Sequence, residues 1–185
     1  MANLFPIQKQ QEHPIFGRFN ALYGDTLVEQ YPPLLEFQIT ILTKEEFKTN
    51  PGVLPIVKLD NRDAFAYSSD KQNDSPSSTK AVIIYNPALI EILQLTEEEQ
   101  FAAIAHEIGH IIYRFSTLKN QYSGKQGQEI YSDSIAANIG LASEMISVIE
   151  KLEGSGMFND AESRFGMRKL HLRCMYNDTI VEEDY

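Results

Sequence analysis

The chain contains little cysteine, little positive charge and no long apolar run, and each of these shortages excludes a class of protein. Its 185 residues include a single cysteine, Cys174, so no disulfide can form within the chain. The 26 acidic residues outnumber the 16 lysines and arginines, and the net charge of −10 argues against binding to nucleic acids or anionic membranes. No apolar run approaches the roughly 18 residues of a membrane-spanning helix. The first residues also lack the charged and apolar regions of a signal peptide, so we expect a cytoplasmic location.

The stretch His106-Glu107-Ile108-Gly109-His110 forms a complete H-E-x-x-H motif and uses two of the chain's 4 histidines. A step of four residues advances slightly more than one turn of an α-helix, so both imidazoles project from one face. Two neutral imidazoles at this spacing can bind one Zn²⁺, and Glu107 lies close by without being a ligand. The metal can then acidify a water whose proton Glu107 accepts. The motif therefore predicts a zinc-dependent hydrolase, and first of all a peptidase.

The residues before the motif indicate the start of a helix. Thr96 followed by Glu99 is a capping box, and three acidic residues in the first turn complement the positive end of the helix dipole. Apolar residues continue at spacings of three and four, which predicts a helix from about Glu97 to about Phe115 with one buried face. The alternative is a buried helix whose histidines only make hydrogen bonds. The ligand spacing around a glutamate favours the metal site.

A catalytic zinc site needs a third protein ligand and keeps one position for water. The polar stretch from Tyr113 to Gln128 indicates a loop, after which a second helix is predicted to begin. On that helix Glu129 can complete a His₂Glu site. Asp133, four residues later on the same face, can accept the outer N–H of a liganding imidazole and fix its tautomer. Three later glutamates are expected to face solvent: Glu144, Glu150 and Glu153.

An H-E-x-x-H motif followed downstream by E-x-x-x-D resembles the gluzincin pattern of thermolysin-like peptidases. More narrowly, the chain resembles small soluble relatives of the CAAX prenyl protease and HtpX-type peptidase family. Their second motif commonly reads E-x-x-A-D, and Ser132 stands here in place of the alanine. Three further segments are similar to that family: residues 61–66, where Asp63 replaces an asparagine, residues 82–90 and residues 168–172. The resemblance implies a zincin-like fold and endopeptidase activity. The missing apolar span separates the chain from the membrane-embedded members, so their substrates are not carried over.

Peptide hydrolysis also uses a donor that stabilises the tetrahedral oxyanion. Three side chains are candidates for this donor: His171, Tyr131 and Arg168. Of these we retain His171 as the candidate catalytic residue beside Glu107. By analogy with the family, a strand at 64–67 or at 81–85 would pair with an extended peptide or protein substrate.

We expect an α+β, zincin-like metallopeptidase domain over residues 1–185. An N-terminal helical segment (1–34) would contain a helix from His13 to Gln30. The sheet region (35–95) has strand-like runs at 35–41, 55–59, 64–67 and 81–85, which predict a small, mostly antiparallel sheet packed on the motif helix. The helical zinc-site region (96–176) would continue through helices at 128–152 and 159–176. The acidic tail (177–185) would fray.

Three functions are compatible with these residues. The first is a soluble zinc endopeptidase that holds one Zn²⁺ per chain through His106, His110 and Glu129. The second is a regulatory protease of the ImmA type that cleaves a repressor or partner. Asp133 favours the first, because the regulatory type tends to lack that aspartate. The third is a latent or non-enzymatic, zinc-stabilised interaction module, and the intact Glu107 argues against it because a scaffold needs no general base.

Overall fold

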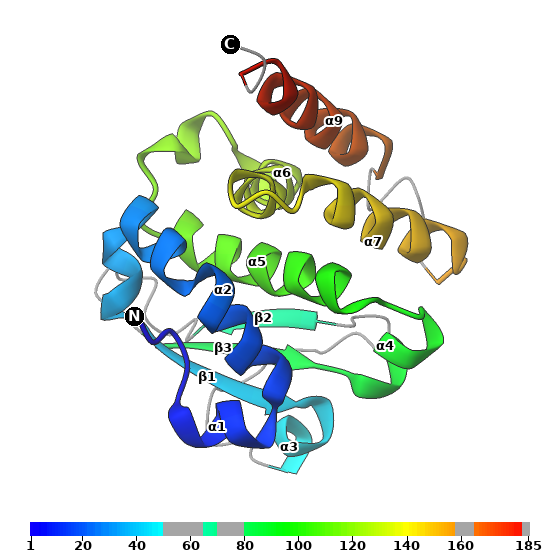
Figure 1. Ribbon diagram of the computed structural model, residues 1–185. Coiled ribbons are helices and arrows are strands. Elements are labelled where there is room, and N and C mark those ends of the chain that lie inside the picture. Colours follow the sequence, from blue (N-terminus) through cyan, green and yellow to red (C-terminus); the bar gives the residue numbers. More distant parts are fainter. Residues whose placement is uncertain (50–64, 70–79, 158–164, 183–185) are drawn as a thin grey trace. The chain divides into compact units, whose positions relative to one another are not determined.

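The computed structural model describes residues 1–49, 65–69, 80–157 and 165–182 (Figure 1). These residues are mostly helical and contain one small sheet, which confirms the predicted α+β class. The chain divides into two compact units, Met1–Ile92 and Leu93–Tyr185. The single domain expected from the chain length stays a prediction. In the described ranges, no helix is both long and apolar enough to cross a membrane.

The first unit combines short helices with three strands: α1 (Ile7–Glu12), α2 (Pro14–Gln30), the 3₁₀ helix η1 (Pro32–Glu36), β1 (Gln38–Thr43), α3 (Lys44–Thr49), β2 (Phe65–Ser69), β3 (Lys80–Tyr85) and α4 (Pro87–Ile92). The helix predicted from His13 is α2, which begins at Pro14. Proline suits the first position of a helix, because the N–H group that it lacks would have no partner within the helix there. α1 was not predicted, since it buries no side chain and shows no apolar periodicity. The strand predicted at 35–41 begins later, at Gln38, because η1 extends to Glu36.

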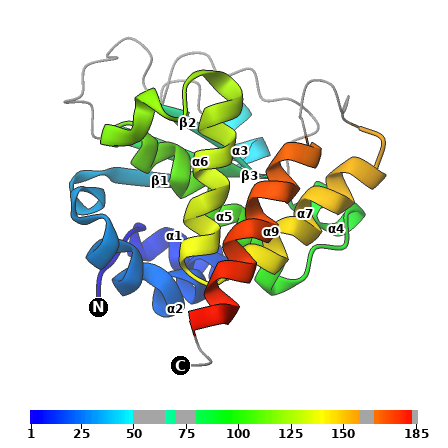
Figure 2. The same cartoon turned by 90° about the horizontal axis from the view of Figure 1, so that it is seen from above.

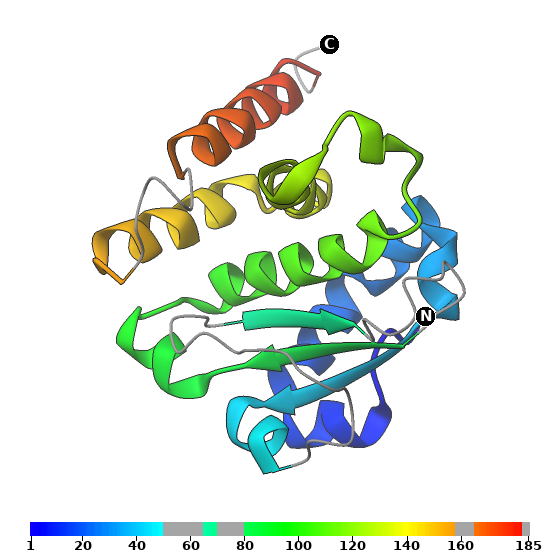
Figure 3. The same ribbon diagram turned by 180° about the vertical axis from the view of Figure 1, so that it is seen from behind.

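The sheet has the strand order β1–β3–β2 (Figure 3). The central strand β3 runs parallel to β1, with Ile83 opposite Ile41, and antiparallel to β2, with Ile83 opposite Tyr67. The prediction of a mostly antiparallel sheet was therefore wrong. Hydrophobic patterns report which residues are buried and not the direction of a strand, and the long connection from β1 to β3 lets the chain return parallel. The strand predicted at 55–59 lies outside the described residues.

Polar contacts tie the helices of the first unit to its sheet. Glu46 and Thr43 cap α3 reciprocally: the Glu46 carboxylate accepts the N–H of Thr43 at 2.7 Å, and the Thr43 hydroxyl accepts the N–H of Glu46 at 3.1 Å. The ammonium group of Lys9, on α1, donates to the same carboxylate at 2.8 Å. The Tyr85 hydroxyl on β3 hydrogen-bonds Nδ1 of His13. A small apolar cluster lies between β1, β3 and α3: Leu42, Val82, Ile84 and Phe47.

The second unit is helical: α5 (Glu97–Tyr113), the 3₁₀ helix η3 (Thr117–Asn120), α6 (Gly124–Asn138), α7 (Ala142–Gly154) and α9 (Phe165–Glu182). α5 is the predicted motif helix, and its capping box is present: the Thr96 hydroxyl accepts the N–H of Glu99, and the Glu99 carboxylate accepts the N–H of Thr96. The stretch predicted as a loop from Tyr113 to Gln128 is shorter, because η3 lies within it and α6 begins at Gly124.

Two of the predicted helix boundaries downstream were wrong. The single helix expected over 128–152 is two helices, α6 and α7, separated at Gly140, whose φ of 85° lies in the left-handed region that favours glycine. The N–H of Leu141 then bonds the carbonyl of Ala136 at 2.9 Å and closes the end of α6. The acidic tail was expected to fray from 177, but α9 continues to Glu182. Residues 159–164 and 183–185 lie outside the described ranges.

Gly109 allows α5 and α6 to approach closely. A Cβ atom added at Gly109 would lie 2.6 Å from the Cα atom of Ser132, a separation that side chains do not adopt. The glycine of the motif therefore allows close packing of the two helix backbones. In Figure 2 α6 lies beside α9, and the two helices are joined by hydrogen bonds between Asp133 and Arg168. These close approaches bring residues of three helices together.

Candidate metal centre

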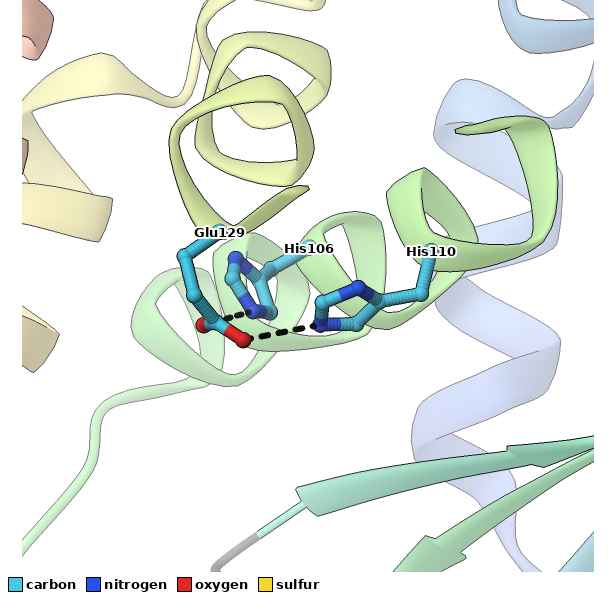
Figure 4. A group of neighbouring side chains, drawn as sticks. All are labelled: His106, His110 and Glu129. Atoms are coloured by element: carbon cyan, nitrogen blue, oxygen red, sulfur yellow. Dashed lines mark ion pairs between the residues drawn. The ribbon is translucent and has the colours of Figure 1, made fainter. Parts of the chain in front are cut away.

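His106 and His110 on α5 converge with Glu129 on α6 (Figure 4). The Nε2 atom of His106 lies 3.4 Å from Oε2 of Glu129, and the Nε2 atom of His110 lies 3.8 Å from Oε1. The ligands of a tetrahedral zinc lie about 2.0–2.2 Å from the ion, and so roughly 3.3–3.5 Å from one another. The three side chains are 8%, 12% and 27% exposed, in that order. This group could hold a metal ion, and the two imidazoles and one carboxylate suit zinc.

The outer nitrogen of each histidine is held from α6. Nδ1 of His106 lies 2.8 Å from Oδ1 of Asp133, and Nδ1 of His110 lies 3.0 Å from the hydroxyl of Ser132. Because Nδ1 is engaged in both rings, each Nε2 atom is left to face Glu129. Asp133 thus contacts one of the two motif histidines, as the sequence predicts, while its part in supporting a metal ligand stays a prediction. The contact of Ser132 was not predicted.

Arg168, on α9, holds Asp133 through two hydrogen bonds. Its Nε and Nη2 atoms donate to the two carboxylate oxygens at 2.6 and 2.7 Å, and its Nη1 atom lies 3.5 Å from Oε2 of Glu129. Asp133 is fully buried and Arg168 is 7% exposed, so both charges have lost most of their hydration. The attraction and hydrogen bonds between them offset this loss. The sequence names Arg168 as a candidate oxyanion donor and does not predict its contact with Asp133. Small residues around an aspartate indicate that its helix packs closely and that the carboxylate is buried, so it needs a cationic partner. The sequence does not tell which basic residue provides that partner.

The electrostatics of the group favour an ionised Glu129 beside a protonated His106 when no metal is bound. Burial by itself lowers the pKa of His106, but hydrogen bonds to Asp133 and Glu129 outweigh it and raise that pKa to about 10. Burial raises the pKa of Glu129, but the hydrogen bond and charge of His106 outweigh it, so the net shift is downward. Burial and the neighbouring His106 lower the pKa of His110 to about 3. A metal ion bound at His106 would replace the proton there.

Glu107 lies on α5 between the two histidines and is 7% exposed. Its negative charge acts on Arg168: burial by itself lowers the pKa of this guanidinium, but the charge and hydrogen bonds of Asp133 and the charges of Glu129 and Glu107 outweigh burial and raise that pKa. The predicted general base is thus a buried carboxylate close to the same cation that supports the candidate ligands.

The other residues singled out in the sequence, His171, Tyr131 and the later glutamates, do not belong to the group of His106, His110 and Glu129. His171, one turn after Arg168 on α9, is partly buried, and its Nε2 atom has no hydrogen-bond partner among the described residues. Its catalytic role stays a prediction. The Tyr131 ring packs edge-on against Tyr113 and Tyr122, with ring centroids 5.4 Å apart in both pairs, and so serves packing. The later glutamates lie on α7, where Glu150 and Glu153 are exposed and pair with basic residues of α9.

A second group in the first unit has the side chains of a cation site but already contains a cation. Glu12, His13 and Glu46 lie close enough together to share an ion. The ammonium group of Lys9 lies 2.5 Å from the Glu12 carboxylate and 2.8 Å from that of Glu46. This lysine neutralises the two carboxylates, so a metal would have to displace it. Of the two groups, the one on α5 and α6 is therefore the better candidate for a metal site.

The candidate metal centre combines residues that local motifs identify with residues that only folding brings to them. His106, His110 and Glu129 are the ligands that the motifs predict, and Ser132 and Arg168 support them from outside. No protein-family model matches the chain, and no curated protein or solved structure is significantly similar to it.

Proposed function

We propose that the protein is a zinc-dependent endopeptidase of the gluzincin type with a zincin-like fold, similar to small soluble relatives of the CAAX prenyl protease and HtpX-type family. One observation carries the proposal: His106, His110 and Glu129 converge with separations that suit one Zn²⁺. The H-E-x-x-H spacing alone predicts two of these ligands. The third comes from the helix on which the motif pattern predicts it.

The proposed mechanism assigns each residue one task. His106, His110 and Glu129 would hold the ion, which when bound polarises a peptide carbonyl and lowers the pKa of a water molecule. The carboxylate of Glu107 accepts a proton from the attacking water and passes it to the departing amine. Asp133 keeps the proton of His106 on Nδ1, and Arg168 keeps Asp133 ionised. A peptide or protein is the substrate class that this chemistry serves.

The number of ligands favours an enzyme over a zinc-stabilised interaction module. Structural zinc sites are almost always closed by four protein ligands, whereas catalytic sites use three and leave one position open. Within the described ranges the group has three members. The buried Glu107 supports the same choice, because a structural site has no use for a general base. A regulatory protease with one physiological partner would use the same residues.

The test compares zinc content and hydrolysis of casein and short peptides for the native chain, Glu107→Gln, Glu129→Ala and a matched control, Glu98→Gln, which changes an exposed glutamate on the same helix. We expect Glu107→Gln to keep its zinc and to lose about 10²- to 10⁴-fold in kcat, because it lacks only the proton acceptor. Glu129→Ala should lose zinc affinity, and Glu98→Gln should match the native chain. Full hydrolysis by zinc-loaded Glu107→Gln would contradict the mechanism. A native chain that binds zinc but cleaves nothing would support the interaction module.

A further inference from the structure

Ser132 is a fully buried serine in the middle of α6, between Glu129 and Asp133 in the chain. A serine inside a helix commonly bonds a backbone carbonyl of the preceding turn. Ser134, also buried on α6, does this: its hydroxyl donates to the carbonyl of Tyr131 at 2.6 Å. The hydroxyl of Ser132 instead lies 3.0 Å from Nδ1 of His110 on the neighbouring helix. This hydroxyl is therefore directed to a candidate ligand.

The close packing of α5 against α6 makes this contact possible. The missing side chain of Gly109 lets the backbone of Ser132 approach α5, since a Cβ atom there would lie 2.6 Å from the Cα atom of Ser132. His110 is the next residue of α5. A short side chain such as serine can therefore reach the outer nitrogen of His110. Alanine is common at this position in the family that the chain resembles, and it has no polar atom to make this contact.

A liganding imidazole is neutral and carries its single proton on the nitrogen that does not face the metal. Asp133 can only accept a hydrogen bond, so it holds the proton of His106 on Nδ1. We propose that Ser132 is the corresponding positioning residue of His110: its hydroxyl accepts the Nδ1–H and leaves Nε2 for the metal. This inference rests on the proposed metal function. Each of the two histidine ligands then has its own hydrogen-bond partner: the charged Asp133 for His106 and the neutral Ser132 for His110.

The experiment measures zinc affinity by competition with a chelator for the native chain, Ser132→Ala and the matched control Ser134→Ala. Both variants remove one buried hydroxyl from α6 and keep the Cβ atom, so packing on Gly109 is preserved. Loss of a partner that orients a ligand typically weakens metal binding about 10- to 100-fold, and we expect this for Ser132→Ala alone. Thermal unfolding of the metal-free variants reports any general damage to the fold.

A second pair of variants separates the hydroxyl from side-chain shape. Threonine and valine have nearly the same volume, and only threonine carries the hydroxyl, so Ser132→Thr should bind zinc more tightly than Ser132→Val. In the zinc-loaded native chain, ¹⁵N NMR of the imidazoles should find the His110 proton on Nδ1, protected from exchange with water. In Ser132→Ala this proton should exchange faster.

The outcomes distinguish this inference from the function on which it rests. If the native chain binds zinc and Ser132→Ala binds it equally well with an unchanged His110 spectrum, Ser132 is a packing residue and the inference is wrong, while the metal site stands. Equal zinc affinity of Ser132→Thr and Ser132→Val would overturn the inference in the same way. If the native chain binds no zinc, the proposed function fails, and the inference fails with it.

Discussion

At the scale of single residues, Asp133 and Arg168 form a buried ion pair in the second unit, and burying these two charges costs free energy that their contacts must offset. A fully buried carboxylate loses several kcal/mol of hydration, and its two hydrogen bonds from one guanidinium offset that loss. Burial raises the pKa of Asp133, but the charge and hydrogen bonds of Arg168 outweigh it and lower that pKa. The same guanidinium also lies near Glu129. Arg168 thus contacts both the buried Asp133 and Glu129, one of the three residues that could hold a metal ion.

We therefore predict that Arg168→Met destabilises the metal-free protein by about 3–5 kcal/mol, because the buried Asp133 carboxylate loses both hydrogen bonds from the guanidinium and keeps, among the described residues, only its contact with His106. Arg173→Met is the matched control, since Arg173 lies on the same helix and pairs with Glu150 at 3.3 Å while both side chains are at least half exposed. An exposed pair of this kind contributes about 0–1 kcal/mol. Urea denaturation followed by circular dichroism measures both. A loss for Arg168→Met no larger than for Arg173→Met would show that Asp133 finds another partner.

At the scale of helices and strands, the local patterns predicted the elements better than their ends and directions. The cap of α5 at Thr96 depends on residues of one turn and was predicted correctly. The break at Gly140 was missed, because small and apolar residues continue across it and a single glycine is compatible with a continuous helix. The parallel direction of β3 relative to β1 depends on the path of the intervening chain, which no pattern within a strand reports.

The close approach of α5 and α6 predicts the effect of a substitution in the motif. Gly109→Ala should gain about 1 kcal/mol of intrinsic helix propensity. The added methyl group would meet the backbone of Ser132, which cannot move aside as a flexible side chain would, so we expect a net loss of about 1–3 kcal/mol and weaker zinc binding. Gly154→Ala at the end of α7 is the control, because no atom of the described part of the chain lies within 4 Å of a Cβ atom there. Thermal unfolding compares the two variants, and equal or greater stability of Gly109→Ala would contradict the close approach.

At the scale of the whole molecule, acidic residues outnumber basic ones by 26 to 16, and two opposing effects act as the pH falls. Protonation of unpaired carboxylates relieves their mutual repulsion. Protonation of paired carboxylates removes attractions that the folded chain needs. Glu46 belongs to the second class: burial raises its pKa, but hydrogen bonds from Lys9 and Thr43 outweigh this and lower the pKa to about 2. Since the ordinary value is 4.5, Glu46 stabilises the fold above that pH and loses this contribution toward pH 2.

Glu46→Gln should accordingly be less stable than the native chain at neutral pH, and the difference in free energy of unfolding should shrink between about pH 4.5 and 2. Denaturation curves at a series of pH values measure this difference. Glu45→Gln is the control, because its side chain is 78% exposed and should change stability little at any pH. A difference for Glu46→Gln that stays constant from about pH 5 to pH 3 would show that its charge does not stabilise the folded state.

The sequence by itself determined the helix that carries His106, Glu107 and His110, its capped start and the placement of Glu129 four residues before Asp133. These features depend on neighbours within one or two helical turns, so their spacing is sufficient to predict them. Only the tertiary structure decided that Ser132 holds His110 and that Arg168 holds Asp133, contacts between residues 22 and 35 positions apart. Such contacts form only when helices pack, because burial then requires every polar group to find a partner that no local pattern names.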